Sequence, residues 1–157
     1  MTEMTEMTEK PKPPRPTLSL EASYRNALYE VAGDDPLVLR IGAAVPLSWL
    51  QHRGAHSATL ITAWNPFSRE LPEPVNLARL QQLRRAVDAA GLRHLPARGC
   101  DPSGLWTPEP GLCVLDLAEA LAGEWLREYE QFAAVVADAR GCRLLWHPEV
   151  TAPSTEA

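Results

Sequence analysis

Short apolar segments, separated by Gly, Pro and polar residues, recur along this chain and constrain its fold more than any other feature. Most of them are rich in Val, Leu, Ile or Thr, which is typical of β-strands. The last two flank Asp138-Ala139-Arg140-Gly141, a sequence that indicates a hairpin turn. The segments expected as strands are 37–41, 58–64, 92–98, 112–115, 132–137 and 142–146.

Apolar residues recur at helical spacing between these segments. Leu20, Tyr24, Leu28 and Val31 follow the period of a helix, and Gly33 is expected to end it. The longest apolar stripe lies in segment 77–90, between strands 58–64 and 92–98, and Gly91 is expected to end this helix. The remaining helices are expected over 46–52, 77–90 and 116–129.

The helices between strands also predict the directions in which the strands run. Because helix 77–90 separates strands 58–64 and 92–98, we expect those strands to run parallel, joined by a right-handed crossover. Strand 112–115 follows without a helix and is expected to run the opposite way. The sequence therefore predicts an α+β fold, a single domain with a mixed sheet of five or six strands and helices packed on it.

The domain is expected to occupy residues 17–148, because 157 residues leave little room for a second core. Residues 1–16 combine a threefold Met-Thr-Glu repeat with a Pro-rich run, and they are expected to be disordered. Residues 149–157 are also expected to be a disordered tail.

Composition excludes several classes of protein. The hydrophobic fraction of 45% suits a folded domain, and no apolar run is long enough for a transmembrane helix. No apolar signal core is present, and three Cys residues do not indicate a disulfide scaffold, so a cytoplasmic location is expected. The net charge of −5 argues against nucleic acid as a partner.

The predicted strand directions bring polar residues from distant segments to one edge of the sheet, the edge at which strand 58–64 ends. We call it the carboxyl edge. Two long Pro-rich loops are expected there, and crevices at such edges commonly bind ligands. The residues expected at the carboxyl edge are Arg40, Trp64, Asn65, Asn76, Arg79, Asp101, Trp106, Glu109 and Gln131.

The order of these residues along the chain resembles a known family. The pattern comprises Leu39-Arg40-Ile41-Gly42, Ile61-Thr62-Ala63-Trp64-Asn65-Pro66, Asn76 and Arg79, Gly99 and Asp101, Trp106 with Glu109-Pro110, and Gln131. Over about residues 24–146 it resembles the bacterial family catalogued as domain of unknown function 3293. The chain has Gly111 where the family usually has Ser, and Phe132 where it tends to have Asn. The resemblance implies a compact bacterial protein and brings no known activity.

Three functions fit this set of residues. The first is a binding module for a small polar or anionic molecule, nucleotide-like ones included. In it Arg40 and Arg79 supply charge, Trp106 a stacking face, and Asn65, Asn76, Gln131 and Trp64 complete the site. The second is an enzyme that uses Asp101 and Glu109 as acid and base or as metal ligands. The third is a protein–protein adaptor that uses a basic stretch at 79–98 and an acidic one at 116–130.

Structural alternatives exist for most of these residues. Asn76 is expected to cap the helix that follows it, and Gln131 to satisfy the backbone of a loop. Arg40 is expected to pair with Asp101 or Glu109 at the carboxyl edge, either as a structural bridge or as part of a site, and the predicted strand directions bring Glu109 close to it. No cofactor is indicated, and the Cys and His residues lack the spacing of zinc ligands.

Overall fold

The computed structural model describes Lys10 and residues 12–151. The tails predicted at 1–16 and 149–157 lie largely outside these residues. The helices of the described part are α2 (Leu18–Asn26), α3 (Leu47–His52), α4 (Glu73–Ala89) and α5 (Glu119–Glu128), with a 3-10 turn η1 (Pro66–Ser68). The strands are β1 (Leu28–Val31), β2 (Leu37–Leu39), β3 (Ala58–Ile61), β4 (His94–Cys100), β5 (Glu109–Leu115), β6 (Ala133–Asp138) and β7 (Gly141–Trp146).

The strands form one sheet in the order β2-β1-β4-β5-β3-β6-β7, and every neighbouring pair is antiparallel. The α+β class is therefore confirmed. The predicted mixed sheet of five or six strands is wrong, because the sheet has seven strands and no parallel pair among the described residues.

The position of β5 explains why the sheet is antiparallel. Strands β3 and β4 do run in the same direction, since both pair antiparallel with β5. They are not neighbours, however, because β5 returns into the gap that the crossover through α4 leaves between them. The predicted direction of β5 is confirmed, and so the two parallel strands are separated by one that runs the opposite way.

The strand that sequence analysis missed is β1. A helix was expected from Leu20 to Val31, but α2 ends at Asn26 and the chain continues as an extended strand. Ala27, Tyr29 and Val31 are buried while the residues between them are more exposed, which is the alternation of a half-buried strand. Pairing with β2 on one side and β4 on the other stabilises the extended form.

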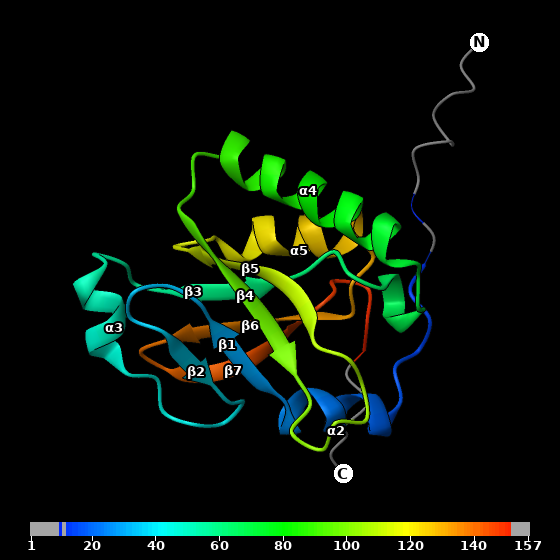
Figure 1. Ribbon diagram of the computed structural model, residues 1–157, viewed down its shortest axis with the longest axis horizontal. Coiled ribbons are helices and arrows are strands. Elements are labelled where there is room, and N and C mark those ends of the chain that lie inside the picture. The colour runs from blue at the N-terminus through cyan, green and yellow to red at the C-terminus, as the bar shows by residue number, and fades with distance from the viewer. Residues whose placement is uncertain (1–9, 11, 152–157) are drawn as a thin grey trace.

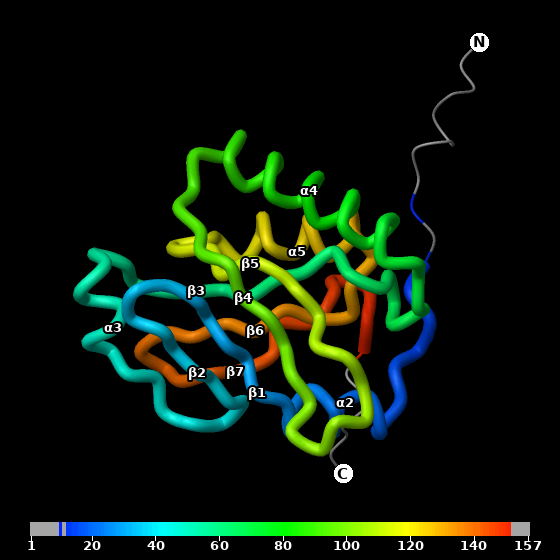
Figure 2. The backbone as a smooth tube through the Cα atoms, in the orientation of Figure 1, coloured from blue at the N-terminus to red at the C-terminus, as the bar shows by residue number. Residues whose placement is uncertain are grey.

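The sheet curls into a half-barrel with a different cover on each face. Helices α4 and α5 lie side by side over the outer face (Figure 1), where they bury a core that includes Leu83, Leu126 and Leu112. The curl brings the two ends of the sheet together, and the Gly42 amide donates to the Cys142 carbonyl at 2.8 Å. The smooth trace shows the same curl, with α3 and α2 at opposite ends of the rolled sheet (Figure 2).

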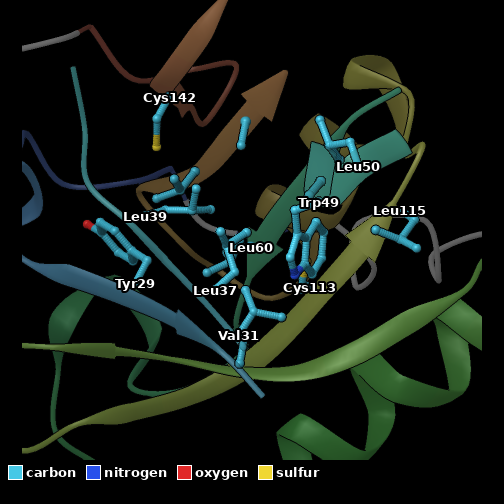
Figure 3. Packing of buried hydrophobic residues seen from close by; sticks show 14 of the residues in the cluster. Tyr29, Val31, Leu37, Leu39, Trp49, Leu50, Leu60, Cys113, Leu115 and Cys142 are labelled. Carbon is cyan, nitrogen blue, oxygen red and sulfur yellow. The ribbon is translucent and has the colours of Figure 1, made fainter. Parts of the chain in front are cut away.

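The inner face of the half-barrel holds a second core. Tyr29, Leu39 and Leu60 meet there, and α3 adds Trp49 and Leu50 (Figure 3). The Trp49 indole donates to the Asp35 carbonyl at 2.7 Å, which fixes α3 against the loop before β2. Both faces of the sheet are therefore buried over most of its area. Within the described part of the chain, no helix has the length and apolarity needed to cross a lipid bilayer.

Helix α5 begins later than its sequence suggests. Asp116 and Glu119 have capping-box spacing, which predicts a start at Asp116, but the N-cap is Ala118. The Asp116 carboxylate instead accepts hydrogen bonds from the amides of His56 and Ser57, at 2.7 and 3.2 Å. It therefore joins the end of β5 to the start of β3 rather than capping a helix.

Gly111 allows β5 to lie against β3. A Cβ atom at this position would stand 2.6 Å from the Ile61 carbonyl oxygen and 3.1 Å from Thr62 Cβ. Backbone atoms cannot give way as a flexible side chain can. A Ser would not fit at this position without a shift of one of the two strands.

We expect Gly111→Ala to lower the free energy of unfolding by about 1–3 kcal/mol, the usual cost of an overpacked core. Gly99→Ala is the matched control in the neighbouring strand, because a Cβ there meets the Tyr29 ring at an ordinary 3.5 Å. Urea denaturation of the two variants measures the difference. Equal stability of both variants would contradict the close approach of β5 to β3.

Candidate functional site

A cavity of about 310 Å³ lies inside the half-barrel at the carboxyl edge. Its walls come from the ends of β3 and β4, the starts of β5 and β6, and helix α2, which lies across this end of the sheet (Figure 1). The two Pro-rich loops that follow β3 and β4 complete it. Of the nine residues predicted at this edge, those that line the cavity are Trp64, Asn65, Trp106, Glu109 and Gln131.

Small residues at inward-facing positions create the space. Inward and outward side chains alternate along each strand, so Gly111 faces the same way as Cys113 in the inner core. Ala97 and Gly99 of β4 and Ala133 of β6 also line the cavity. Larger side chains further along these strands fill the half-barrel, and so the room is confined to the carboxyl edge.

Glu109 is the charged side chain that these strands place inside the cavity. It stands two residues before Gly111 on the inward face of β5, directly opposite Gly99. Its carboxylate accepts a hydrogen bond from Asn65 Nδ2 at 3.3 Å. No Lys, Arg or His of the described residues forms an ion pair with it within 4 Å. Burial raises the pKa of Glu109 to about 7, and the Asn65 hydrogen bond opposes this rise only in part.

Asn76 holds Asn65 in place, and the two residues together orient the Asn65 side-chain nitrogen that donates to Glu109. The Asn65 amide donates to Asn76 Oδ1 at 2.9 Å, and Asn76 Nδ2 donates to Asn65 Oδ1 at 2.8 Å. The Leu71 amide also donates to Asn65 Oδ1, at 3.0 Å. Asn65 has a φ of 47°, in the left-handed region that Asn tolerates better than most residues. One side-chain nitrogen therefore stays free to reach Glu109.

Asn76 itself does not line the cavity. The prediction that it caps a helix is wrong, because α4 begins at Glu73 after the N-cap Pro72, and Asn76 lies within its first turns. Its side chain is 1% exposed, and its role is to support Asn65. Sequence analysis singled out Asn76, but it did not predict that its partner is Asn65, eleven positions earlier.

Gln131 and Arg79 both bind the backbone around Trp64. Gln131 Nε2 donates to the carbonyls of Trp64 and Tyr129 at 3.1 and 3.0 Å, as the structural alternative expected. Its Oε1 has no protein partner among the described residues, and the residue lines the cavity. Arg79 donates to the carbonyls of Ala63 and Tyr129 and lies 3.6 Å from Glu130. The Arg79 guanidinium therefore binds backbone carbonyls and Glu130, and it does not line the cavity.

Four aromatic residues line the cavity, and two of them were not predicted. Trp64 and Trp106 come from the two loops, whereas Tyr24 and Tyr29 come from α2 and β1. The Tyr29 hydroxyl donates to the Tyr24 carbonyl at 2.7 Å. Burial raises the pKa of both tyrosines, and the nearby charge of Glu109 adds to the rise. Reading residues 27–31 as an alternating strand would have placed Tyr29 here.

Arg40 does not pair with Glu109. It is exposed, it follows β2 at the border of the sheet, and two strands, β1 and β4, separate β2 from β5. No ion pair within 4 Å joins Arg40 to a carboxylate among residues 12–151. The prediction had the direction of β2 right, but it had not included β1 between β2 and β4.

Asp101 is used within its own loop. Its carboxylate accepts from the amide and hydroxyl of Ser103, at 2.9 and 2.7 Å, and from the Leu105 amide at 2.8 Å. The Ser103 hydroxyl is the main cause of a pKa below the usual range for Asp101. Asp101 does not line the cavity, so it is not placed to act together with Glu109.

The described residues offer no cluster of three or more His, Cys, Asp or Glu side chains that could hold a metal ion. Cys113 and Cys142 are buried in the inner core, as expected. Cys100 is half-buried, and the histidine nearest to it in sequence, His94, contacts Asp88 at 2.8 Å instead. No hydrogen bond joins Cys100 to a histidine among the described residues.

Comparison with known families gives a match for the middle of the chain. Residues 61–134 match the family described as protein of unknown function (DUF3293). This segment runs from the end of β3 to the start of β6 and contains Glu109, Asn65, Asn76 and Gln131. No curated protein and no solved structure matches the chain.

We expect Asn76→Ala to lower the free energy of unfolding by about 2 kcal/mol, because it leaves the half-buried Asn65 amide and Leu71 carbonyl without their Asn76 partners. Gln82→Ala is the matched control, an exposed position on the same helix. Urea denaturation compares the two variants. A loss as small as that of the control would show that the Asn65–Asn76 pair does not stabilise the loop.

Glu109→Gln should make the protein more stable at high pH. Because the folded pKa is raised, the folded state binds the proton more tightly than the unfolded state, so stability falls as the pH rises from about 4.5 to about 7. Glu109→Gln removes this loss. Its free energy of unfolding should exceed that of the unchanged protein by on the order of 3 kcal/mol at pH 8 and by less than about 1 kcal/mol at pH 5. Urea denaturation at both pH values, with exposed Glu124→Gln as control, measures it. A gain that is the same at both pH values would contradict burial of the charge.

Proposed function

This chain belongs to the DUF3293 family, and we propose that it binds a small organic molecule in the cavity at the carboxyl edge. The observation that carries the proposal is a cavity with an apolar, aromatic wall and a few polar atoms that converge on it. Glu109 and Gln131 offer oxygen atoms that the protein uses only in part. This combination is typical of ligand sites, and a volume of about 310 Å³ is at the lower end of their range.

The charge of the cavity favours a polar ligand over an anionic one. The arginines expected to attract an anion are elsewhere, since Arg79 binds backbone carbonyls and Arg40 is exposed at the border of the sheet. Arg98 contributes to the cavity wall, but its side chain pairs with Glu30 at 2.8 Å on the outward side of β4. An anion would therefore meet Glu109 without a compensating cation.

An enzyme is the second candidate function. A carboxyl group with a pKa of about 7 is suited to act as general acid or base at neutral pH. Glu109 would fill this role alone, because Asp101 is bound within its own loop. Turnover of the bound molecule, lost in Glu109→Gln while binding of the molecule is kept, would support this candidate over a binding module.

The adaptor stays a prediction with less support. Helix α5 of the acidic stretch has Glu119 bound to Arg143 at 2.8 Å, and Arg93 of the basic stretch donates to the Arg53 carbonyl at 2.7 Å. These charges are partly satisfied within the chain, which leaves fewer of them for a partner.

Screening of a small-molecule library against the full chain tests the proposal. We expect ligands that raise the melting temperature of the protein and of Ala22→Phe, but not of Ser23→Phe. Both positions are on α2, where Ser23 lines the cavity and Ala22 is exposed. A phenyl ring at 23 fills the cavity, whereas one at 22 projects into solvent. Ligands that stabilise both variants equally, or the absence of any ligand, would contradict the proposal.

A further inference from the structure

The cavity combines several aromatic rings with the Glu109 carboxylate, which has no cationic partner in the described part of the chain. Tyr29, Gly99 and Glu109 are in register across β1, β4 and β5, and side chains at paired positions face the same side of a sheet. The Tyr29 ring and the tip of the Trp106 ring lie within 4.0 Å of where a Gly99 Cβ would stand. Because Gly99 has no side chain, the two rings and Glu109 border one open space.

Trp64 and Tyr24 border the same space from two other directions. Trp64 follows β3, and its backbone is fixed by Thr62, which accepts from the Trp64 amide at 3.0 Å. Tyr24 comes from α2, where its ring packs edge-on against Trp146 at 6.0 Å between centroids. Contacts with Trp146 and Thr62 therefore hold the Tyr24 ring and the Trp64 backbone at the border of this space.

We infer that the cavity binds an organic cation, a small amine or quaternary ammonium group seated among the aromatic rings against the Glu109 carboxylate. This inference rests on the proposed function and specifies its ligand class. The negative faces of aromatic rings attract cations, and the attraction grows when water is excluded. A buried carboxylate is costly to the fold unless an opposite charge pairs with it. The ligand would supply that charge.

Among the described residues that line the cavity, none offers Glu109 a competing cation. Besides Glu109, the titratable or charged residues that line the cavity are Tyr24 on α2, Tyr29 on β1, Arg98 on β4 and Glu70 in the loop after η1. Both tyrosines have raised pKa values and stay neutral at pH 8. Arg98 pairs with Glu30 on the other face of the sheet, and Glu70 is exposed. Glu109 thus sets the charge that a ligand meets.

Choline and 3,3-dimethylbutan-1-ol test the charge requirement, because they share a shape and differ in the positive charge. Both are titrated into the full chain at pH 8, and the indole N–H signals of Trp64 and Trp106 report binding in the cavity. We expect choline to bind at least tenfold more tightly than the alcohol. Glu109→Gln should abolish this preference, and Glu124→Gln, an exposed change on α5, should keep it.

The pH gives a second readout of the same contact. Protonation of Glu109 removes the charge that attracts the cation, so choline should bind roughly tenfold more weakly at pH 5.5 than at pH 8. The alcohol should bind equally at both values. Equal binding of choline and the alcohol, or a preference that survives Glu109→Gln, would overturn the inference.

Failure of this inference differs from failure of the proposed function. If choline does not bind while neutral or anionic library members do, and Ser23→Phe blocks them, the cavity is a ligand site but not one for cations. If nothing of any charge binds in the cavity, both proposals are wrong.

Discussion

The insertion of β5 between β3 and β4 is the constraint on which the rest of the structure depends. It requires Gly111, because the Ile61 carbonyl occupies the space that a side chain would need. Once β5 is in this position, its alternation sends Glu109 to the inner face of the half-barrel and Leu112 to the face under α4 and α5. A single close contact between two strands thus determines both the outer core and the carboxylate of the cavity.

The interior of the cavity is organised around one charge that the protein does not neutralise. Asn65 gives Glu109 a single long hydrogen bond, and Asn76 keeps Asn65 in the conformation that provides it. A half-buried carboxylate without a cation lowers stability when it is ionised, and groups with shifted pKa values are concentrated at functional sites. The nearby arginines are used elsewhere, Arg79 on backbone carbonyls and Arg98 on Glu30. The arrangement supports the binding of a ligand that completes the charge pair.

The sequence predicted the strand directions well because helices and turns between strands are visible in it. Sequence analysis therefore correctly predicted that Trp64, Trp106, Glu109 and Gln131 lie at one edge of the sheet. It failed where one pattern has two interpretations: residues 27–31 fit both a helix and a strand, and only pairing with β2 and β4 decides between them. Because β1 was not predicted, Arg40 was expected too close to Glu109, and Tyr29 was not recognised as a residue of the cavity. The hydrogen bonds between Asn65 and Asn76 could not be predicted either, because they depend on the conformation of the loop and not on the spacing of the two residues.

The charge state of Glu109 can be observed directly. In a chain labelled with ¹³C at the glutamate side-chain carboxyl carbon, the signal that is lost in Glu109→Gln identifies the residue, and its shift can be followed as the pH is changed. The structure predicts a titration midpoint near 7, well above the ordinary value of 4.5. A midpoint at or below 4.5 would mean that the carboxylate is solvated or paired with a cation, and it would contradict the cavity described above.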